Sequence, residues 1–485
     1  MAIPSYDPTM ILAILPEILL VILAGFIMAF DAIWKPEVKR GLGWMTAGGL
    51  LLIMVVTLIF SRPQGENRLI FGGMLHQDWL SFGFTLLFLF AAAITALFAM
   101  DYKGAGQKGE FYVLMLISTL GMCLMVSAAD IIMLYLAIET TSIPMYILAG
   151  FMTHDDKSTE SGFKYLLFGA AASTIMLYGF SLLYGFSGQT NIYQIALSFY
   201  DLEFPKLAIV GSLLLILAGF SFKISAFPFH FWAPDVYEGS PTPIAGFLST
   251  ASKAAGFVVL IRVLVAIYTP SATPDWTTLL AVISVFTMTV GNVLALAQKN
   301  IKRLLAFSSI AHAGYILIGV VALSAFGMAS VVFYLIAYLI TNLAAFGSVT
   351  AFSQVVGSDE ISAYSGLSRR KPWLGLAMLV AFLSLAGMPP LAGFVAKVFV
   401  FAAAIKEDLI WLAFVGVLNS IIGLYYYLTV LKYIYLYRSD DEDKPLPISR
   451  PYSIALTVLI LGIIIVGTLF GPWFNISTVI ASSIF

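Results

Sequence analysis

The sequence predicts an all-α membrane protein with about fourteen transmembrane helices, and two observations predict it. Hydrophobic residues make up 60% of the 485 residues and charged residues only 11%, with a mean hydropathy of +0.97. A soluble domain carries about 25% charged residues, so this chain has too few polar side chains to coat a soluble surface. The apolar residues also run unbroken over long stretches, whereas β-barrel strands alternate over about ten residues.

A transmembrane helix needs about 20 mainly apolar residues, and the chain offers fourteen such stretches. In chain order they cover residues 9–33, 42–60, 75–100, 110–127, 130–152, 160–186, 207–229, 241–267, 275–297, 301–323, 327–354, 373–404, 408–437 and 451–480. Only a tight turn at Ala128-Ala129 separates the fourth stretch from the fifth. Because no long polar segment interrupts the series, we expect residues 1–485 to form a single membrane domain.

The basic residues predict the orientation, because Lys and Arg concentrate in loops on the inner side of a membrane. With the N-terminus placed outside, the inward loops hold fifteen of the 25 basic residues, namely Lys35, Lys39, Arg40, Lys103, Lys108, Lys157, Lys299, Lys302, Arg303, Arg369, Arg370, Lys371, Arg438, Lys444 and Arg450. The outward loops hold only Arg62, Arg68, Lys206 and Lys406. The asymmetry predicts both termini on the outer side, as an even number of spans requires. The acidic run at residues 440–443 is expected in a solvated inner loop.

Several classes of protein are excluded or disfavoured. The 25 basic and 26 acidic residues nearly cancel, so the chain lacks the basic footprint of a nucleic-acid-binding protein. Its single cysteine, Cys123, lies in an apolar run and offers neither a disulfide nor a CxxC site. The glycine-rich, HExxH and EF-hand motifs of nucleotide and metal sites are also missing. We therefore expect no cofactor and no metal ion on this chain.

Charged residues inside the spans are the candidates for function, because a charge at the bilayer centre costs between about 2.5 and 17 kcal/mol. Glu139 lies nine residues into the fifth span, about 13 Å deep at 1.5 Å per residue. Lys164 lies one to two turns into the sixth span. Because consecutive spans are expected to be neighbours, the two side chains could neutralise each other. The pair is then either a static structural ion pair or one that tunes a nearby titrating group.

Lys223 lies close to a predicted break in the seventh span. Pro228 follows five residues later, and proline cannot donate the backbone hydrogen bond that a continuous helix needs. Backbone groups freed inside the membrane must face protein or water, so Lys223 is expected where water can reach it. His230, just past the proline, is a secondary candidate. In the eighth span, Lys253 is surrounded by Ser, Ala and Gly, which leave room for close packing and water.

A second break is predicted in the twelfth span, where prolines 389–390 lie between Gly387 and Gly393. Lys397 follows two turns beyond it. His312, in the tenth span, is either a hydrogen-bonded core residue or a proton relay, for which its ordinary pKa is suited. Arg262 and Lys432 are expected to extend from span ends toward water, and His76 and His154 to lie on the solvated surface.

The two interrupted helices lie five spans apart, and interruptions at corresponding positions are typical of inverted-repeat transporters. Spans four to eight (110–267) and nine to thirteen (275–437) would form the two repeats. Because five is an odd number, the second repeat begins on the opposite side of the membrane, as an inverted repeat requires. Residues 1–109 would add three helices before the repeats and residues 451–485 one helix after them.

Three stretches resemble a known family. The sequence PFHFWAPDVYEGSPTP (228–243), which continues through FLSTASK to Lys253, closely resembles the antiporter-like membrane subunits of respiratory complex I. NIKRLLAFSSIAHAGY (300–315) and LSLAGMPPLAGFVAKVFVF (383–401) are similar to spans ten and twelve of the same family. The resemblance extends over essentially the whole chain. It implies two inverted five-helix repeats with broken helices seven and twelve.

The resemblance also implies a function. The family assembles into a large enzyme that oxidises NADH or another reductant with quinone, and the NAD, FMN, iron–sulfur and quinone sites are expected on other subunits. Carried over by motif, the proton pathway would comprise Glu139, Lys164, Lys223, Lys253, His312 and Lys397. Our hypothesis is that protons reach Lys223 or Lys253 from the inner side, pass His312 and leave outward from Lys397. Separation of Glu139 from Lys164 would stabilise a protonated Lys223.

Two other functions stay open at the level of the sequence. A subunit of a multi-subunit Mrp-type cation/proton antiporter would share the fold and much of the lysine set. A scaffold of the larger complex, with no pumping of its own, would share the fold alone. In every case the partners are other membrane subunits and lipid, in a bacterial inner membrane or an equivalent energy-coupling membrane.

Overall fold

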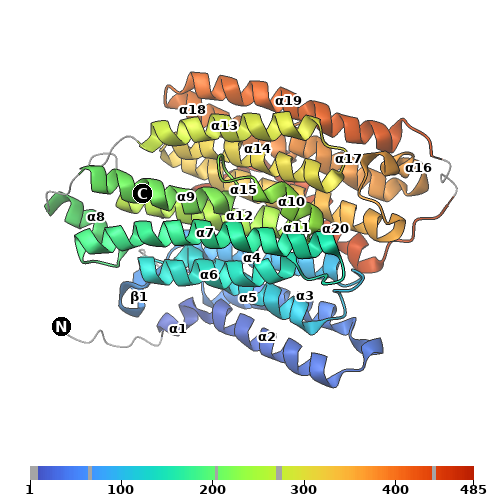
Figure 1. Ribbon diagram of the computed structural model, residues 1–485, viewed down its shortest axis with the longest axis horizontal. Coiled ribbons are helices and arrows are strands. Elements are labelled where there is room, and N and C mark those ends of the chain that lie inside the picture. The colour runs from blue at the N-terminus through green and yellow to red at the C-terminus, as the bar shows by residue number, and fades with distance from the viewer. Residues whose placement is uncertain (1–8, 64–67, 202–205, 269–275, 440–443, 485) are drawn as a thin grey trace.

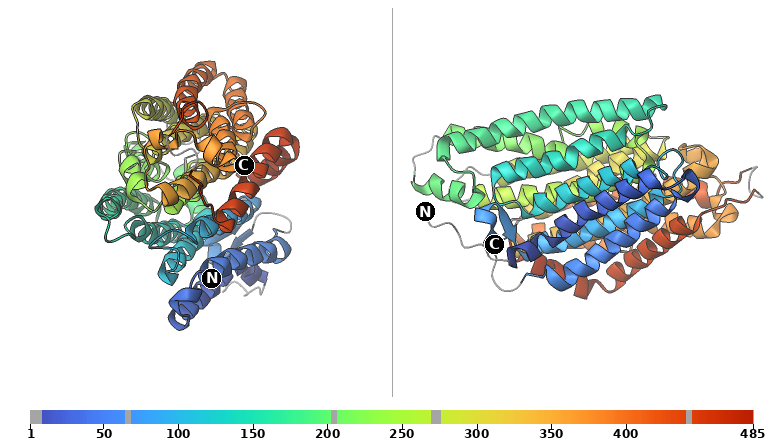
Figure 2. Two further views of the ribbon diagram at one scale, coloured as in Figure 1. Left: turned by 90° about the vertical axis from the view of Figure 1, so that its right-hand side faces the viewer. Right: turned by 90° about the horizontal axis from the view of Figure 1, so that it is seen from below.

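The computed structural model describes residues 9–63, 68–201, 206–268, 276–439 and 444–484, so the acidic run at 440–443 lies outside the described residues. The helices run side by side along one direction, and α2 (Leu15–Ile33) and α3 (Gly41–Phe60) form one edge of the bundle (Figure 1; Figure 2). Within the described residues, thirteen helices are long and apolar enough to cross a membrane. The remaining predicted span, the twelfth, is a pair of shorter helices. The prediction of an all-α polytopic membrane protein is confirmed.

The first eight spans match the predicted stretches to within a few residues, except at their breaks. They are formed by α1 (Thr9–Ala13) with α2, then α3, α4 (Trp79–Ala99), α5 (Gly109–Ser127), α6 (Ile131–Ala149), α7 (Asp156–Ser187), α9 (Lys206–Ile224) with α10 (Trp232–Gly239), and α11 (Thr242–Phe247) with α12 (Lys253–Ile267). A π-helical turn over Leu248–Ser252 joins α11 to α12.

The remaining spans follow in the same way. They are formed by α13 (Trp276–Leu296), α14 (Ile301–Val321), α15 (Ala325–Val356), α17 (Pro372–Ala386) with α18 (Ala392–Lys406), α19 (Ile410–Tyr435), and α20 (Arg450–Thr468) with α21 (Phe470–Ala481). Short helical turns occupy Pro36–Val38, Phe71–Gly73, Ile361–Tyr364 and, as α16, Leu367–Arg370.

Both predicted breaks are present. The chain leaves α9 at Ile224 and becomes helical again only at Trp232, and it leaves α17 at Ala386 and resumes at Ala392. Gly387 closes α17 in the left-handed conformation, with φ of 86°, and its N–H donates to the carbonyl of Leu383 (3.1 Å). Glycine adopts this conformation without a steric penalty. The inverted symmetry of the two repeats stays a prediction.

A β-hairpin and a short helix between two spans were not predicted. β1 (Arg68–Ile70) and β2 (Leu75–Gln77) pair as an antiparallel hairpin before α4, within residues that the sequence analysis assigned to a loop and to the start of the third span. A strand of three residues carries too short a pattern to distinguish it from a loop. α8 (Ile192–Asp201) similarly lies between two spans.

The first described span begins, and the last described span ends, at the same end of the bundle. The backbone N–H of Trp79, at the start of α4, donates to the hydroxyl of Ser483 near the C-terminus (3.2 Å). Because α2, α3 and α4 cross the bundle in alternating directions, the first span begins at the same end. An even number of crossings requires this arrangement.

Candidate functional site

Lys223 lies at the last turn of α9, beside the break, as predicted. Its side chain is 7% exposed, and Nζ donates to the hydroxyl of Ser142 on α6 (2.8 Å). The carbonyls at the C-terminus of a helix carry a partial negative charge, which favours a cation there. The absence of a side chain at Gly256 on α12 leaves room for the stem of Lys223, because a Cβ there would lie 3.1 Å from its Cγ.

Glu139 lies beside Lys223, across a small cavity. The cavity between α6, α7 and α9 is lined in part by Glu139, Ser142, Ser173 and Lys223. Glu139 accepts a short hydrogen bond from the hydroxyl of Ser173 on α7. The structure therefore brings the half-buried glutamate of the fifth span and the buried lysine of the seventh span to one small cavity.

Lys164 does not pair with Glu139, contrary to the ion pair expected from the sequence. Its ammonium binds Asp235 Oδ2 on α10 (2.6 Å) and Glu160 Oε1, one turn earlier on α7 (2.7 Å). Spans six and five are neighbours, but the lysine side chain extends toward the end of the bundle where α7 begins. It is also 35% exposed, whereas Lys223, Lys253, His312 and Lys397 are all buried.

Lys253 follows the π-helical turn in the eighth span. It is 1% exposed, and Nζ donates to both the backbone carbonyl (2.9 Å) and the hydroxyl of Ser309 on α14. The first half of the chain thus contacts the second half through a lysine. Such π-helical turns occur frequently at functional sites.

His312 is one turn further along α14 and lies in a polar pocket. Its Nδ1 contacts the hydroxyl of Tyr334 (2.7 Å), and its Nε2 contacts the hydroxyl of Tyr427 (3.3 Å). The Tyr427 hydroxyl is also paired with Ser308, the residue next to the Lys253 partner. A short chain of hydroxyl groups therefore connects the surroundings of Lys253 with His312.

Lys397, on α18 beyond the second break, is 5% exposed. Its Nζ donates to the last carbonyls of α17, those of Leu385 (3.1 Å) and Ala386 (3.0 Å), and to the hydroxyl of Ser420 (2.9 Å). A small cavity lined by His312, Tyr334 and Leu385, among others, reaches Ala396, the residue before this lysine. The free carbonyl groups at the end of α17 thus take the place of water around the Lys397 ammonium.

His230 lies in the break between α9 and α10, 1% exposed. Neither ring nitrogen has a hydrogen-bond partner among the described residues. The ring lies between Phe227 and Phe231, at centroid distances of 5.8 and 4.3 Å. It therefore does not join the polar row formed by the other candidates.

Two predictions of surface residues are wrong. Arg262 is 5% exposed, and its guanidinium binds Asp78 Oδ2 (2.8 Å) and the carbonyl of Val126 (2.9 Å). His76, on the unpredicted hairpin, is also buried and contacts both Arg262 (2.6 Å) and Asp78 (2.9 Å). Because Asp78 caps α4, this cluster fixes the hairpin and α12 to the start of that helix. His154 is exposed and Cys123 is buried, as expected.

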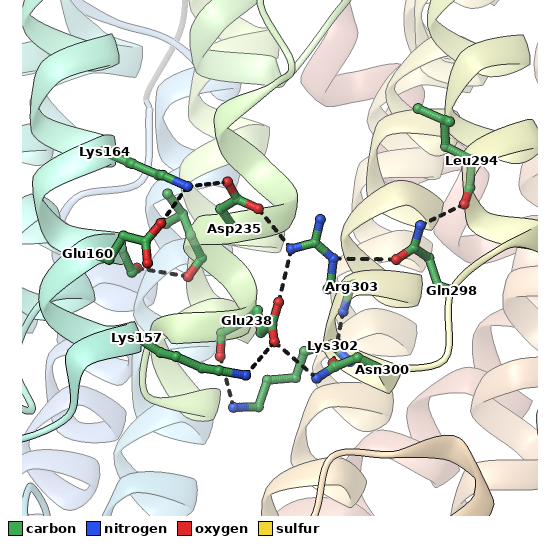
Figure 3. A network of polar contacts seen from close by, with 12 residues as sticks. Lys157, Glu160, Lys164, Asp235, Glu238, Leu294, Gln298, Asn300, Lys302 and Arg303 are labelled. Atoms are coloured by element: carbon green, nitrogen blue, oxygen red, sulfur yellow. Dashed lines mark hydrogen bonds and ion pairs between the residues drawn. The ribbon is translucent and has the colours of Figure 1, made fainter.

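A network of ion pairs that was not predicted from the sequence lies at the lysine-rich end of the bundle (Figure 3). At its centre, Asp235 and Glu238 on α10 both bind Arg303 of α14, at 2.7 and 2.9 Å. Lys164 binds the other oxygen of Asp235 (2.6 Å), and Lys157 binds Glu238 (2.8 Å). Two carboxylates one turn apart in the stretch PDVYEG were the available signal.

Within the described part of the chain, no three His, Cys, Asp or Glu side chains gather where they could hold a metal ion. The site is instead a row of lysines, hydroxyl groups and one histidine. Such a row inside a bundle with two broken helices defines a class of ion-translocating membrane proteins.

Comparison with known proteins specifies this class. A family model described as NADH:quinone oxidoreductase/Mrp antiporter, TM matches residues 128–423. NADH-quinone oxidoreductase subunit N of Heliobacterium modesticaldum is 43% identical over 458 residues, which cover 93% of this chain and 94% of the relative. The subunit N of Moorella thermoacetica is 42% identical, with the same coverage. The chain belongs to the subunit N family of the antiporter-like membrane subunits, as its motifs suggested.

The solved structures agree. A chain of respiratory complex I from Thermus thermophilus matches with a TM-score of 0.79 and 32% identity, covering 95% of this chain and 98% of that one. A chain of the Mrp complex from Dietzia sp. matches with a TM-score of 0.85 over 96% of each chain, but at 20% identity. The second likeness shows a shared fold.

Proposed function

We propose that this chain is the proton-translocating subunit of a redox-driven complex, in which quinone reduction on other subunits drives protons along its buried lysines. The observation that carries the proposal is the chemistry of the lysine partners. Among the described residues, Lys223, Lys253 and Lys397 hydrogen-bond only to hydroxyl groups and backbone carbonyls. A buried amine with neutral partners can lose its proton without leaving a carboxylate unpaired, whereas a structural ion pair cannot.

The order of residues gives the proposed path. A proton taken up from the inner side reaches Lys223, whose charge Glu139 stabilises across their shared cavity. It passes to Lys253, which binds Ser309, then through the adjacent Ser308 and Tyr427 to His312, and from there to Lys397. Because these groups interact, they would titrate as a coupled set. Release from Lys397 would be to the outer side.

The same proposal includes the surroundings of the chain. The electron donor, NAD, FMN, iron–sulfur clusters and quinone would be bound by other subunits, and the partners in the membrane would be other membrane-arm subunits of the complex. Both termini would face the outer side of a bacterial inner membrane or an equivalent membrane. The excess of Lys and Arg at the opposite end of the bundle supports this orientation.

The test is the substitution Lys223→Ala in the assembled complex, with electron transfer and proton pumping measured in the same vesicles. We expect assembly to be retained and pumping to fall, because the first buried amine of the row is lost. Lys432→Ala is the matched control, since Lys432 is an exposed lysine near the end of α19. Full pumping by the Lys223 variant would contradict the proposal.

Two measurements separate the other functions. Co-purification with a flavin- and iron–sulfur-containing arm supports the redox complex, whereas its absence together with Na⁺-dependent proton movement supports an Mrp-type antiporter. A complex that carries both Lys223→Ala and Lys397→Ala, assembles normally and pumps at the wild-type ratio would instead identify a scaffold.

A further inference from the structure

Asp235 connects the two halves of the chain through a single carboxylate. Its Oδ2 binds Lys164 on α7 (2.6 Å) and its Oδ1 binds Arg303 on α14 (2.7 Å), as Figure 3 shows. The carboxylate is 35% exposed and thus lies at a rim that water can reach. Since both cations depend on the same group, a change on either side alters how firmly the other is held.

The contacts of Lys164 place its ammonium far from Glu139. Glu139 is bonded to Ser173, which lies nine residues after Lys164 on α7, about 13 Å along the helix at 1.5 Å per residue. Lys164 is bonded instead to Asp235 and to Glu160, one turn in the opposite direction. In this state Glu139 has no lysine of α7 beside it and faces Lys223 across their cavity.

α10 contacts residues next to both Lys164 and Lys223. The indole of Trp232, three residues before Asp235, stacks on the ring of Tyr165, the neighbour of Lys164, at a centroid distance of 4.5 Å. The same indole N–H donates to the carbonyl of Phe222, the neighbour of Lys223 (3.2 Å). One short helix therefore contacts the residues next to both lysines.

Arg303 provides the connection to the second half. It also binds Glu238 (2.9 Å), and it lies on the same helix as Ser309 and His312. A shift of α14 during proton transfer would therefore change how strongly Arg303 binds Asp235. When Arg303 binds Asp235 more strongly, it neutralises more of the charge on that carboxylate. Asp235 then holds Lys164 less firmly, and Lys164 can turn toward Glu139.

We propose that Asp235 is a positioning residue that competes with Glu139 for Lys164, and that Arg303 controls this competition from the second half of the chain. The proposal rests on the proposed function above and adds two residues to it. With Lys164 held by Asp235, Glu139 stabilises a charged Lys223; with Lys164 released to Glu139, the proton on Lys223 is expelled along the row.

The test measures proton pumping and electron transfer in the assembled complex for Asp235→Asn, Lys164→Gln and the double variant. Loss of one partly exposed ion pair costs about 1 kcal/mol. This corresponds to a roughly fivefold change in the ratio between the two positions of Lys164, at Asp235 and at Glu139. We expect a loss of pumping of this size for Asp235→Asn and a double variant no worse than Lys164→Gln alone, because Asp235 acts through Lys164. Asp235→Glu should restore most of the pumping.

The control is Asp31→Asn, which also removes one carboxylate from a partly buried ion pair at this end of the bundle, that with Lys39, but outside the network. It is expected to pump as the wild type does. The proposal would be overturned if the loss of pumping in the double variant were the product of the losses in the two single variants. Wild-type pumping by Asp235→Asn would also overturn it. If Asp235→Asn does not assemble, Arg303→Gln replaces it, with reduced pumping expected and wild-type pumping contradictory. Normal pumping by Lys223→Ala in parallel would identify a failure of the proposed function instead.

Discussion

At the scale of residues, the buried lysines share one solution to a single problem. A charged amine is costly inside a membrane, yet Lys223 and Lys397 both lie where a helix ends within the bundle. There the last carbonyls have no partner in their own helix and carry partial negative charge. Lys397 binds two such carbonyls directly. The main chain thus stabilises the charge without fixing it in a permanent ion pair.

Arg262 represents the opposite case, in which a buried charge is fixed. We expect Arg262→Met to cost about 3–5 kcal/mol of stability, because it leaves the carboxylate of Asp78, 0% exposed, without its cation. The measurement is the thermal unfolding temperature of the purified complex and the amount of subunit incorporated. Arg62→Met is the control, since Arg62 is exposed and its guanidinium lies over the face of Trp79 (5.2 Å). Equal stability of the two variants would contradict this role.

Which residues are buried was easier to predict than which residues pair. A lysine in an apolar span is conspicuous in the sequence, and Lys223, Lys253 and Lys397 are all buried as expected. Lys164 was assigned to Glu139 because their spans are consecutive. Its actual partner, Asp235, lies 71 residues further along the chain and reaches it only because α10 lies against α7. Contacts between distant segments leave no pattern in a single sequence.

At the scale of elements, the two breaks are the features that place the lysines. Proline and glycine predicted both, since a missing N–H and a left-handed residue end a helix whatever surrounds it. The β-hairpin and α8 could not be predicted in this way. Their positions depend on contacts with other segments, such as the burial of His76 against Arg262.

The second break depends on the close approach of α17 and α18 at Gly393. A Cβ at this position would lie 1.9 Å from the carbonyl oxygen of Ser384, so the two helices could not keep their distance. We expect Gly393→Ala to destabilise the subunit by at least about 1–3 kcal/mol, which is the typical cost of overpacking, and to displace Lys397. Gly211→Ala on α9 is the control, because nothing lies within 4 Å of its added methyl group. The amount of assembled complex after mild heating measures both, and equal amounts would contradict the role of Gly393.

At the scale of the whole molecule, the polar row crosses from one half of the chain to the other. Lys223 and Lys253 belong to the first half, and Ser309, His312 and Lys397 to the second. The contact of Lys253 with Ser309 and the contacts of Asp235 with Arg303 join the halves at two levels of the bundle. A movement in one half can therefore change the protonation of the other, which a coupled pump requires.

The central claim is that protons pass along this row, and His312 lies in the middle of it. The most direct measurement is the number of protons pumped per electron by the assembled complex with His312→Leu, reconstituted in vesicles. The matched control is His154→Leu, because His154 is an exposed loop histidine. We predict that electron transfer continues in both and that only the His312 variant loses the share of pumping that this subunit contributes. A wild-type ratio of protons to electrons in the assembled His312→Leu complex would contradict the account.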